Sequence, residues 1–243
     1  MEVTFREWDD VLRGGRLETP PGRDEVRVCL ATIPPEEAGL AAFTHLLGPD
    51  ERARAARFTV AEPRRQFVFG RIILRQWLGA CLGIEPAAVE LGCQSRGKPC
   101  LMPSARHPDL RFNLSHSGRR LAIAMACGRE VGVDIERIQP LADWLPLTER
   151  IFSPRERVEL LALPQPRQLA AFFNGWTRKE AWLKAMGEGL TDDLPAIEVT
   201  LDPEREPAWL ALPGGPSVVR QWGLRAIPLP PDFAGAVVFR ASP

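Results

Sequence analysis

Residues 110–136 read LRFNLSHSGRRLAIAMACGREVGVDIE and contain three short apolar runs separated by glycine-containing turns. Such a pattern is typical of neighbouring strands. The runs are Leu110–Ser115, Leu121–Ala126 and Val131–Ile135. Because residues two apart on a strand point to the same side, Asp134 and Glu136 face together. We expect the third strand to be buried except at these two carboxylates.

Elements predicted on either side of these runs give the fold class. Before residue 110 we expect a strand at Val26–Leu30, helices at Glu36–Leu47, Asp50–Phe58 and Pro63–Gly83, and a loop or hairpin at Gly92–Leu101. After residue 136 we expect a helix opened by the capping box Ser153–Glu156, a long helix at Arg167–Met186, and strands at Ala196–Leu201, Pro207–Leu212, Val218–Ile227 and Phe233–Arg240.

Helices followed by a few strands occur twice, which predicts an α+β protein of two similar halves. Their link should fall near Gly128–Glu130, giving halves at residues 1–129 and 130–243. With 243 residues, either one large domain or two smaller ones can bury a core.

Composition excludes several classes of protein. The chain has 31 basic and 31 acidic residues, whereas a nucleic-acid binder normally carries a positive excess. The longest apolar run, Leu121–Cys127, is far below the roughly 20 residues that a membrane span needs. Five cysteines without a C-x-x-C pair, and no secretory signal, indicate a cytoplasmic protein with reduced thiols.

Positive charge is concentrated in the first half. Residues 1–130 carry a net charge of +3 and residues 131–243 one of −3. The segment Asp50–Arg75 alone holds seven arginines against three acids. Most of these arginines are expected on solvated helix faces, and a few can clamp a phosphate through forked hydrogen bonds.

Three groups of polar residues can carry chemistry. Asp134 and Glu136 either lie on a solvated strand face or bind a cation, and their oxygens suit Mg²⁺ rather than zinc. On the long helix, Glu180 and Lys184 share a face with Trp176. They either form an exposed ion pair with each other or bind a ligand. In the second case Glu180 is a third metal ligand and Lys184 contacts a phosphate.

The third group is the run FNLSHSG at residues 112–118, which places an amide, two hydroxyls and His116 at the end of a strand. A lone histidine is usually structural, but Gly97-Lys98-Pro99 upstream favours anion binding. The chain has no Walker A, G-x-G-x-x-G, H-E-x-x-H or G-x-S-x-G motif. The residues therefore indicate a Mg²⁺-dependent site for a phosphate-rich ligand, assembled between two halves.

Three motifs resemble, in the same order, those of 4′-phosphopantetheinyl transferases of the Sfp type. They are FNLSHSG, VGVDIE and WTRKEAWLKAMGEGL. The resemblance covers about residues 97–190. It implies a pseudo-twofold protein that binds coenzyme A in the cleft between its halves, with the 3′-phosphate and adenine on the first half and the metal and catalysis on the second. Such an enzyme moves phosphopantetheine from coenzyme A to a serine of an apo acyl or peptidyl carrier protein and releases 3′,5′-ADP.

The resemblance also implies roles for individual residues. Asp134, Glu136 and Glu180 would bind Mg²⁺, and Lys184 would contact the phosphates. Either Glu180 or a metal-bound water would accept the serine proton. The residues implied for the adenosine-phosphate end of coenzyme A are Lys98, Ser115, His116, Arg54 and Arg57.

One position departs from the family. Four residues before Gly70, where the family often has arginine, this chain has Gln66, with Arg64 and Arg65 just upstream. Either a neighbouring arginine substitutes, or the 3′-phosphate is held more weakly.

Two alternatives remain: a non-catalytic module that binds coenzyme A or a carrier protein, and a Mg²⁺-dependent phosphohydrolase. The enzyme is expected to be a monomer. All three lysines of the chain, Lys98, Lys179 and Lys184, fall within the motif regions. Because Lys179 lies off the Glu180–Lys184 face, it is expected to be structural or to assist docking.

Overall fold

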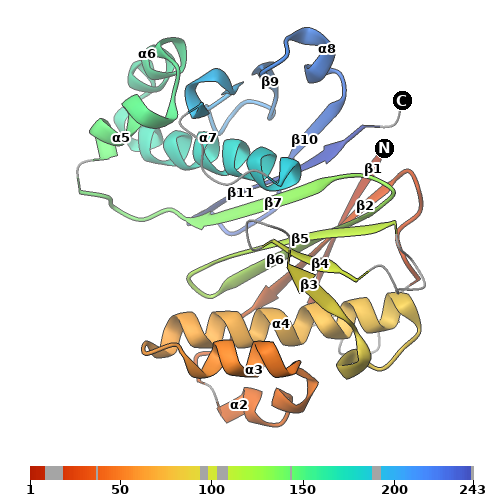
Figure 1. The fold of residues 1–243 in the computed structure, drawn as a ribbon. Helices are drawn as coiled ribbons and strands as arrows, with labels where there is room; N and C mark the ends of the chain where they lie inside the picture. The colour runs from red at the N-terminus through yellow and green to blue at the C-terminus, as the bar shows by residue number, and fades with distance from the viewer. Residues whose placement is uncertain are drawn as a thin grey trace. The chain divides into compact units, whose positions relative to one another are not determined.

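The computed structural model describes residues 1–8, 19–36, 38–93, 98–102, 109–142, 144–187 and 193–241. The chain divides into two compact units, one of residues 2–128 and one of residues 129–243 with Met1. Each unit combines a small sheet with helices (Figure 1), which confirms the predicted α+β class. Among the described residues, no helix is long and apolar enough to cross a membrane.

The N-terminal unit is built on a four-stranded sheet with the order β1-β2-β6-β5. Only the pair β1–β2 is parallel. Residues 121–126 in the middle of β6 are completely buried, which explains why this run is uniformly apolar. The three predicted strands are confirmed as β2 (Glu25–Thr32), β5 (Leu110–Ser117) and β6 (Arg120–Cys127). Strand β1 (Glu2–Glu7) was not predicted.

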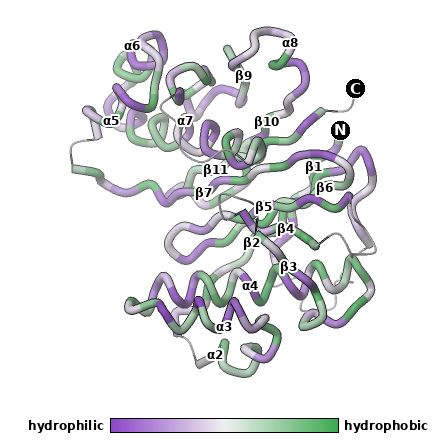
Figure 2. The backbone as a smooth tube through the Cα atoms, viewed as in Figure 1, coloured by the Kyte–Doolittle hydropathy of each residue, from purple (hydrophilic) through white to green (hydrophobic). Residues whose placement is uncertain are grey.

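The long helix α4 (Ala61–Leu82) lies against this sheet. Hydrophobic residues recur along it in Figure 2. Leu74 and Leu78 pack toward the sheet, whereas Val68 and Ile72 join a second apolar cluster with the preceding short helices. The helix is therefore buried on more than one side. It ends at Gly83, whose φ of 65° suits a residue without a side chain.

The segment predicted as one helix at Glu36–Leu47 is not one helix. It forms α2 (Ala38–Ala41) and a 3-10 turn, η1 (Thr44–Leu46). The Thr44 hydroxyl donates to the carbonyl of Ala41, and such side-chain bonds compete with helix continuation. Helix α3 (Pro49–Ala56) and the hairpin of β3 (Leu91–Cys93) and β4 (Pro99–Leu101) agree with prediction. The 3-10 turn η2 (Pro86–Ala88) was not predicted.

The C-terminal unit is built on a three-stranded antiparallel sheet with the order β10-β11-β7, packed against α7. Ser153 caps α6 through the predicted capping box. Gly187, at a φ of 75°, ends α7. The principal elements are β7 (Val131–Arg137), α5 (Trp144–Ile151), α6 (Pro154–Ala162), α7 (Gln165–Met186), β10 (Trp222–Ala226) and β11 (Phe233–Arg240).

Three of the strands predicted after α7 are shorter than expected. The pairing of β8 with β9 shifts register between Glu198 and Val199, which shortens the first two of these strands. Beyond β8, the Thr200 amide donates to the carbonyl of Ala208, and the Thr200 hydroxyl accepts from the backbone of Ala208 and donates to the carbonyl of Glu206. Pro216 begins a short helix where a strand was predicted, because proline suits the first helical turn. These smaller elements are η3 (Leu194–Ala196), β8 (Glu198–Val199), β9 (Trp209–Ala211) and α8 (Pro216–Val219).

Candidate active site

Strand β7 and helix α7 approach each other backbone against backbone at Gly132. A Cβ on Gly132 would lie 2.0 Å from the carbonyl oxygen of Ala181 and 2.4 Å from the amide nitrogen of Ala185. Gly132, Asp134 and Glu136 share one side of the strand. The missing side chain of Gly132 therefore brings the helix next to both carboxylates.

Asp134 and Lys184 form the central ion pair of this site. The Lys184 Nζ donates to Asp134 Oδ1 at 2.7 Å. Asp134 is only 3% exposed, so the expectation that both carboxylates would be solvent-exposed is wrong for this residue. The strand opposite places the small residue Ala236 beside Asp134, and α7 covers the same face. A buried carboxylate is costly unless it is paired, and Lys184 supplies the partner.

Glu180 adds a second acidic group to the pair. Burial raises the pKa of its carboxyl to about 7, and the negative charges of Asp134 and Glu136 act in the same direction, while Lys184 opposes them. Its Oε1 is buried and accepts no hydrogen bond from any described residue. The structure thus brings together four of the predicted site residues, with more negative than positive charge.

The chemistry of this donor set fits a hard divalent cation. The donors are carboxylate oxygens, the cluster has an excess of negative charge, and the buried Oε1 of Glu180 accepts no hydrogen bond from a described residue. Within the described ranges, no three His, Cys, Asp or Glu side chains are already arranged as a set of metal ligands. The side chains of Asp134, Glu136 and Glu180 would therefore have to reorient around an ion, and their role as ligands stays a prediction.

Lys179, the other lysine of this helix, has a structural role. It is fully buried, and its Nζ donates to Glu156 Oε2 at 2.6 Å and to the carbonyls of Ile151 and Leu194 at 2.7 and 3.1 Å. Glu156 is equally buried and also accepts from the backbone of Ser153 and Val199. This network connects α7 to α6 and β8, so the structural alternative for Lys179 holds.

The residues predicted for the adenosine-phosphate end of coenzyme A lie in the N-terminal unit. Ser115 is buried and His116 is exposed, and strand alternation puts them on opposite faces of the sheet, both on β5. Lys98 is half-buried and directly precedes β4. The amide of Gln66 donates to the carbonyl of Gly118 at 2.9 Å, so this side chain supports the turn that follows His116.

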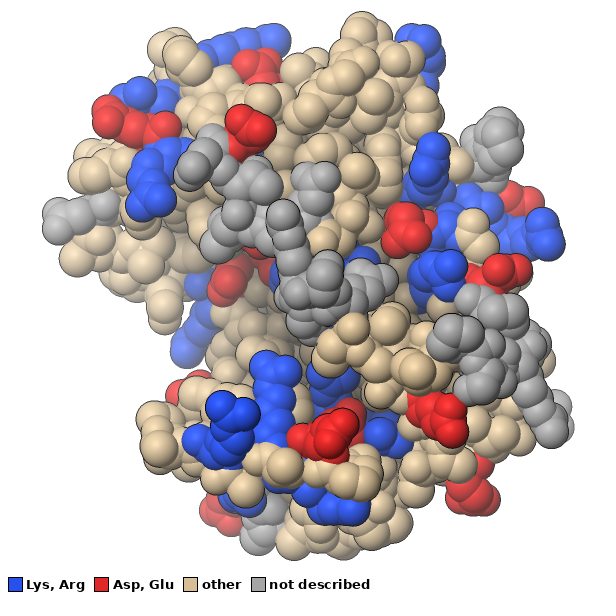
Figure 3. All heavy atoms as spheres, in the orientation of Figure 1, with Lys and Arg blue, Asp and Glu red and all other residues tan. Residues whose placement is uncertain are grey.

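The seven arginines of the segment Asp50–Arg75 differ in burial. Arg52, Arg54 and Arg57 are exposed, and Arg64 and Arg65 are half-buried. The expectation of solvated helix faces fails for the remaining two, Arg71 and Arg75, which are buried. Figure 3 shows basic side chains gathered over α3 and α4 with acidic ones between them.

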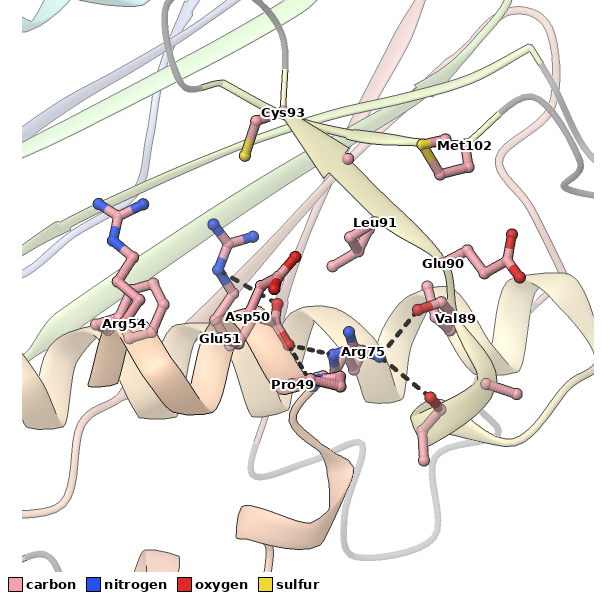
Figure 4. A pocket seen from close by; sticks show the side chains of 16 residues that line it. Pro49, Asp50, Glu51, Arg54, Arg75, Val89, Glu90, Leu91, Cys93 and Met102 are labelled. Atoms are coloured by element: carbon pink, nitrogen blue, oxygen red, sulfur yellow. Dashed lines mark hydrogen bonds and ion pairs between the residues drawn. The ribbon is translucent and has the colours of Figure 1, made fainter. Parts of the chain in front are cut away.

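Arg54, Arg71 and Arg75 line a pocket of about 800 Å³ within this unit (Figure 4). Charge alone does not distinguish Arg71 from the other arginines of the segment. Its position does, because Arg71 lies four residues after Phe67 and three before Leu74, on the helix face of these two apolar residues.

Comparisons with known proteins identify the family of this chain. Residues 130–225 match the 4′-phosphopantetheinyl transferase superfamily, and residues 32–128 match the family described as 4′-phosphopantetheinyl transferase, N-terminal. The 4′-phosphopantetheinyl transferase HetI of Nostoc sp. is 40% identical over 206 residues, which are 81% of this chain and 86% of that protein. Sfp of Bacillus subtilis is 31% identical over 159 residues, 65% of this chain and 68% of that protein.

This chain belongs to the 4′-phosphopantetheinyl transferase family. The resemblance identified from the three sequence motifs is thereby confirmed. The residues Glu188–Leu190 at the end of the third motif lie outside the described part of the chain, as does Gly97 before Lys98.

Proposed function

We propose that this protein transfers the 4′-phosphopantetheine arm of coenzyme A to a serine of an apo acyl or peptidyl carrier protein and releases 3′,5′-ADP. Mg²⁺ bound by Asp134, Glu136 and Glu180 is part of the proposal. The observation that supports it most is the cluster on β7 and α7, where the buried Oε1 of Glu180 has no hydrogen-bond donor among the described residues.

In this proposal the chain supplies charge and position. When bound, Mg²⁺ would neutralise charge on the pyrophosphate that is cleaved. The ammonium group of Lys184 would contact a phosphate held by the metal, because its Nζ lies 2.7 Å from Asp134 Oδ1, within the same cluster. Gly132 maintains the close contact of strand and helix on which these distances depend. Glu180 is the first candidate to accept the serine proton, with a metal-bound water as the second.

The proposal places the adenosine-phosphate end of coenzyme A on the N-terminal unit, with Lys98, Ser115, His116, Arg54 and Arg57 as its contacts. The predictions of a monomer, of a cytoplasmic location, and of no nucleic-acid or membrane partner belong to the same proposal. All five cysteines are free thiols, which suits a reducing compartment.

A mass-shift assay tests the proposal. Wild-type protein, coenzyme A and an apo carrier protein are incubated with Mg²⁺, and the carrier is expected to gain the mass of one phosphopantetheine arm. Chelation of Mg²⁺ is expected to abolish the gain. Hydrolysis of coenzyme A without carrier would indicate a phosphohydrolase instead, and binding without any mass gain across a panel of carriers would indicate a non-catalytic module.

A further inference from the structure

The pocket of the N-terminal unit, described above, lies between two helices and a hairpin. Arg54 comes from α3, Arg71 and Arg75 come from α4, and Leu91, Gly92 and Cys93 of β3 form part of the facing wall. In Figure 4, Arg54 and Arg75 lie on the helical side of the pocket, with Cys93 and Met102 on the hairpin side. The three guanidinium groups differ in how far the protein satisfies them.

Most donors of Arg75 are bound to protein acceptors. Its Nε donates to Glu51 Oε2 at 2.6 Å. Its Nη1 lies 3.2, 3.4 and 2.9 Å from the carbonyl oxygens of Pro86, Ala87 and Val89. Arg75 therefore connects α4 to α3 and to the segment before β3, and its donors are largely occupied.

Arg71 is buried but makes no hydrogen bond to any described residue. It is 8% exposed, and its one ion pair is Nε to Glu51 Oε1 at 3.6 Å, too long for a hydrogen bond. Burial lowers the pKa of its guanidinium, with Glu51 opposing this effect. A planar fork with five N–H donors thus lines the pocket without a hydrogen-bond acceptor among the described residues.

Arg54 provides a second guanidinium at the same place. The Cζ atoms of Arg54 and Arg71 lie 5.0 and 5.4 Å from the centroid of the Phe67 ring. Two forked cations around one ring suit a phosphate monoester, which accepts several hydrogen bonds and carries up to two charges. Asp50 and Glu90 also line the pocket, but neither is among the groups that shift the pKa of Arg71.

We propose that Arg71, together with Arg54, binds the 3′-phosphate of coenzyme A and so determines the preference of this protein for the phosphorylated cofactor. This rests on the proposed function. The hairpin supports it, because Lys98 directly precedes Pro99, which pairs with Cys93 of the pocket wall. Arg71 would then replace the arginine that the family often has at Gln66, whereas neither Arg64 nor Arg65 lines the pocket.

The proposal is tested by calorimetric binding of adenosine 3′,5′-bisphosphate and of 5′-AMP, which differ only in the 3′-phosphate. Wild-type protein is expected to prefer the bisphosphate. In Arg71→Gln this preference should fall roughly ten- to hundredfold, the range for a lost charge-assisted hydrogen bond. Arg64→Gln, a change on the same helix outside the pocket, should leave the preference unchanged.

The outcomes are separable from those of the transfer reaction, because binding is measured without carrier protein and without Mg²⁺. An unchanged preference in Arg71→Gln, an equal loss for both nucleotides, or no preference in the wild type would overturn the proposal. Circular dichroism checks that each variant is folded. Should Arg71→Gln not fold, Arg71→Lys, which keeps the charge and loses the fork, must still reduce the preference several-fold.

Discussion

Helices α4 and α7 are both 22 residues long, both end at a left-handed glycine and both pack on a small sheet. Each helix carries two kinds of buried charged group. On each helix one buried cation is well satisfied: Arg75 by Glu51 and carbonyls, and Lys179 by Glu156 and carbonyls. Each also carries a charged group that the described residues leave incompletely satisfied: Arg71 on α4 and Glu180 on α7. We infer that the number of partners separates these structural charges from the candidate ligand-binding charges.

The largest effect is expected on transfer activity. Glu180→Gln and Asp134→Asn each keep the side-chain shape and remove a negative charge from the proposed metal site. We expect Mg²⁺-dependent transfer to fall by at least about a thousandfold in either variant. Initial rates of carrier modification measure this. Wild-type rates at low Mg²⁺ in both variants would remove these carboxylates from the site.

The second effect concerns stability. Lys179→Met leaves Glu156 buried without its cation, and we expect the free energy of unfolding to fall by about 3–5 kcal/mol. The exposed ion pair of Arg205 and Glu159 is the matched control. Arg205→Gln should lower the free energy of unfolding by less than about 1 kcal/mol. Urea denaturation measures both. Equal losses would contradict the claim that Lys179 supports the fold.

The two helices also differ in how closely they approach their sheets. Gly132→Ala forces a methyl group against the backbone of α7 and should lower the free energy of unfolding by roughly 3 kcal/mol or more. At Gly70 of α4, a Cβ would make ordinary contacts of 3.6 and 3.7 Å with Leu121 and Leu114. Gly70→Ala should therefore be neutral or slightly stabilising, since alanine favours helix. Similar melting temperatures for the two variants would refute this difference.

The smallest effect is expected for a charge-preserving change. Lys184→Arg keeps the positive charge beside Asp134 but replaces a compact ammonium with a planar fork. We expect kcat for transfer to fall about tenfold, or about 1.4 kcal/mol in activation free energy. Lys184→Gln, which also removes the charge, should be slower still. Wild-type kinetics in Lys184→Arg would show that charge alone is required.

The sequence predicts the strands and long helices well where the apolar pattern is continuous. The run at Leu121–Ala126 and the capping box at Ser153 both form as expected. It predicts poorly where an element is interrupted locally, as by the side-chain bond of Thr44 and by the register shift between Glu198 and Val199. It also misses β1, whose sequence Glu2–Glu7 is polar, because that strand depends on parallel pairing with β2.

The candidate site shows the same division. Spacing brings Glu180 and Lys184 to one helix face, and alternation brings Asp134 and Glu136 to one strand face. Spacing does not show that Gly132 allows these two faces to meet or that Asp134 is buried, because both depend on contacts between distant segments. Arg71 was hidden among seven arginines, since charge alone does not distinguish a buried guanidinium from an exposed one.

We infer that the carboxylate of Glu180, whose buried Oε1 has no donor among the described residues, serves a ligand rather than the fold. The free energy of unfolding of Glu180→Gln tests this inference when it is measured by urea denaturation at pH 8 in the presence of a chelator. We expect the variant to be as stable as wild-type protein or more stable by about 0.5–2 kcal/mol, because it removes a buried charge that lacks sufficient partners. A loss of more than about 1 kcal/mol would instead show that Glu180 supports the fold.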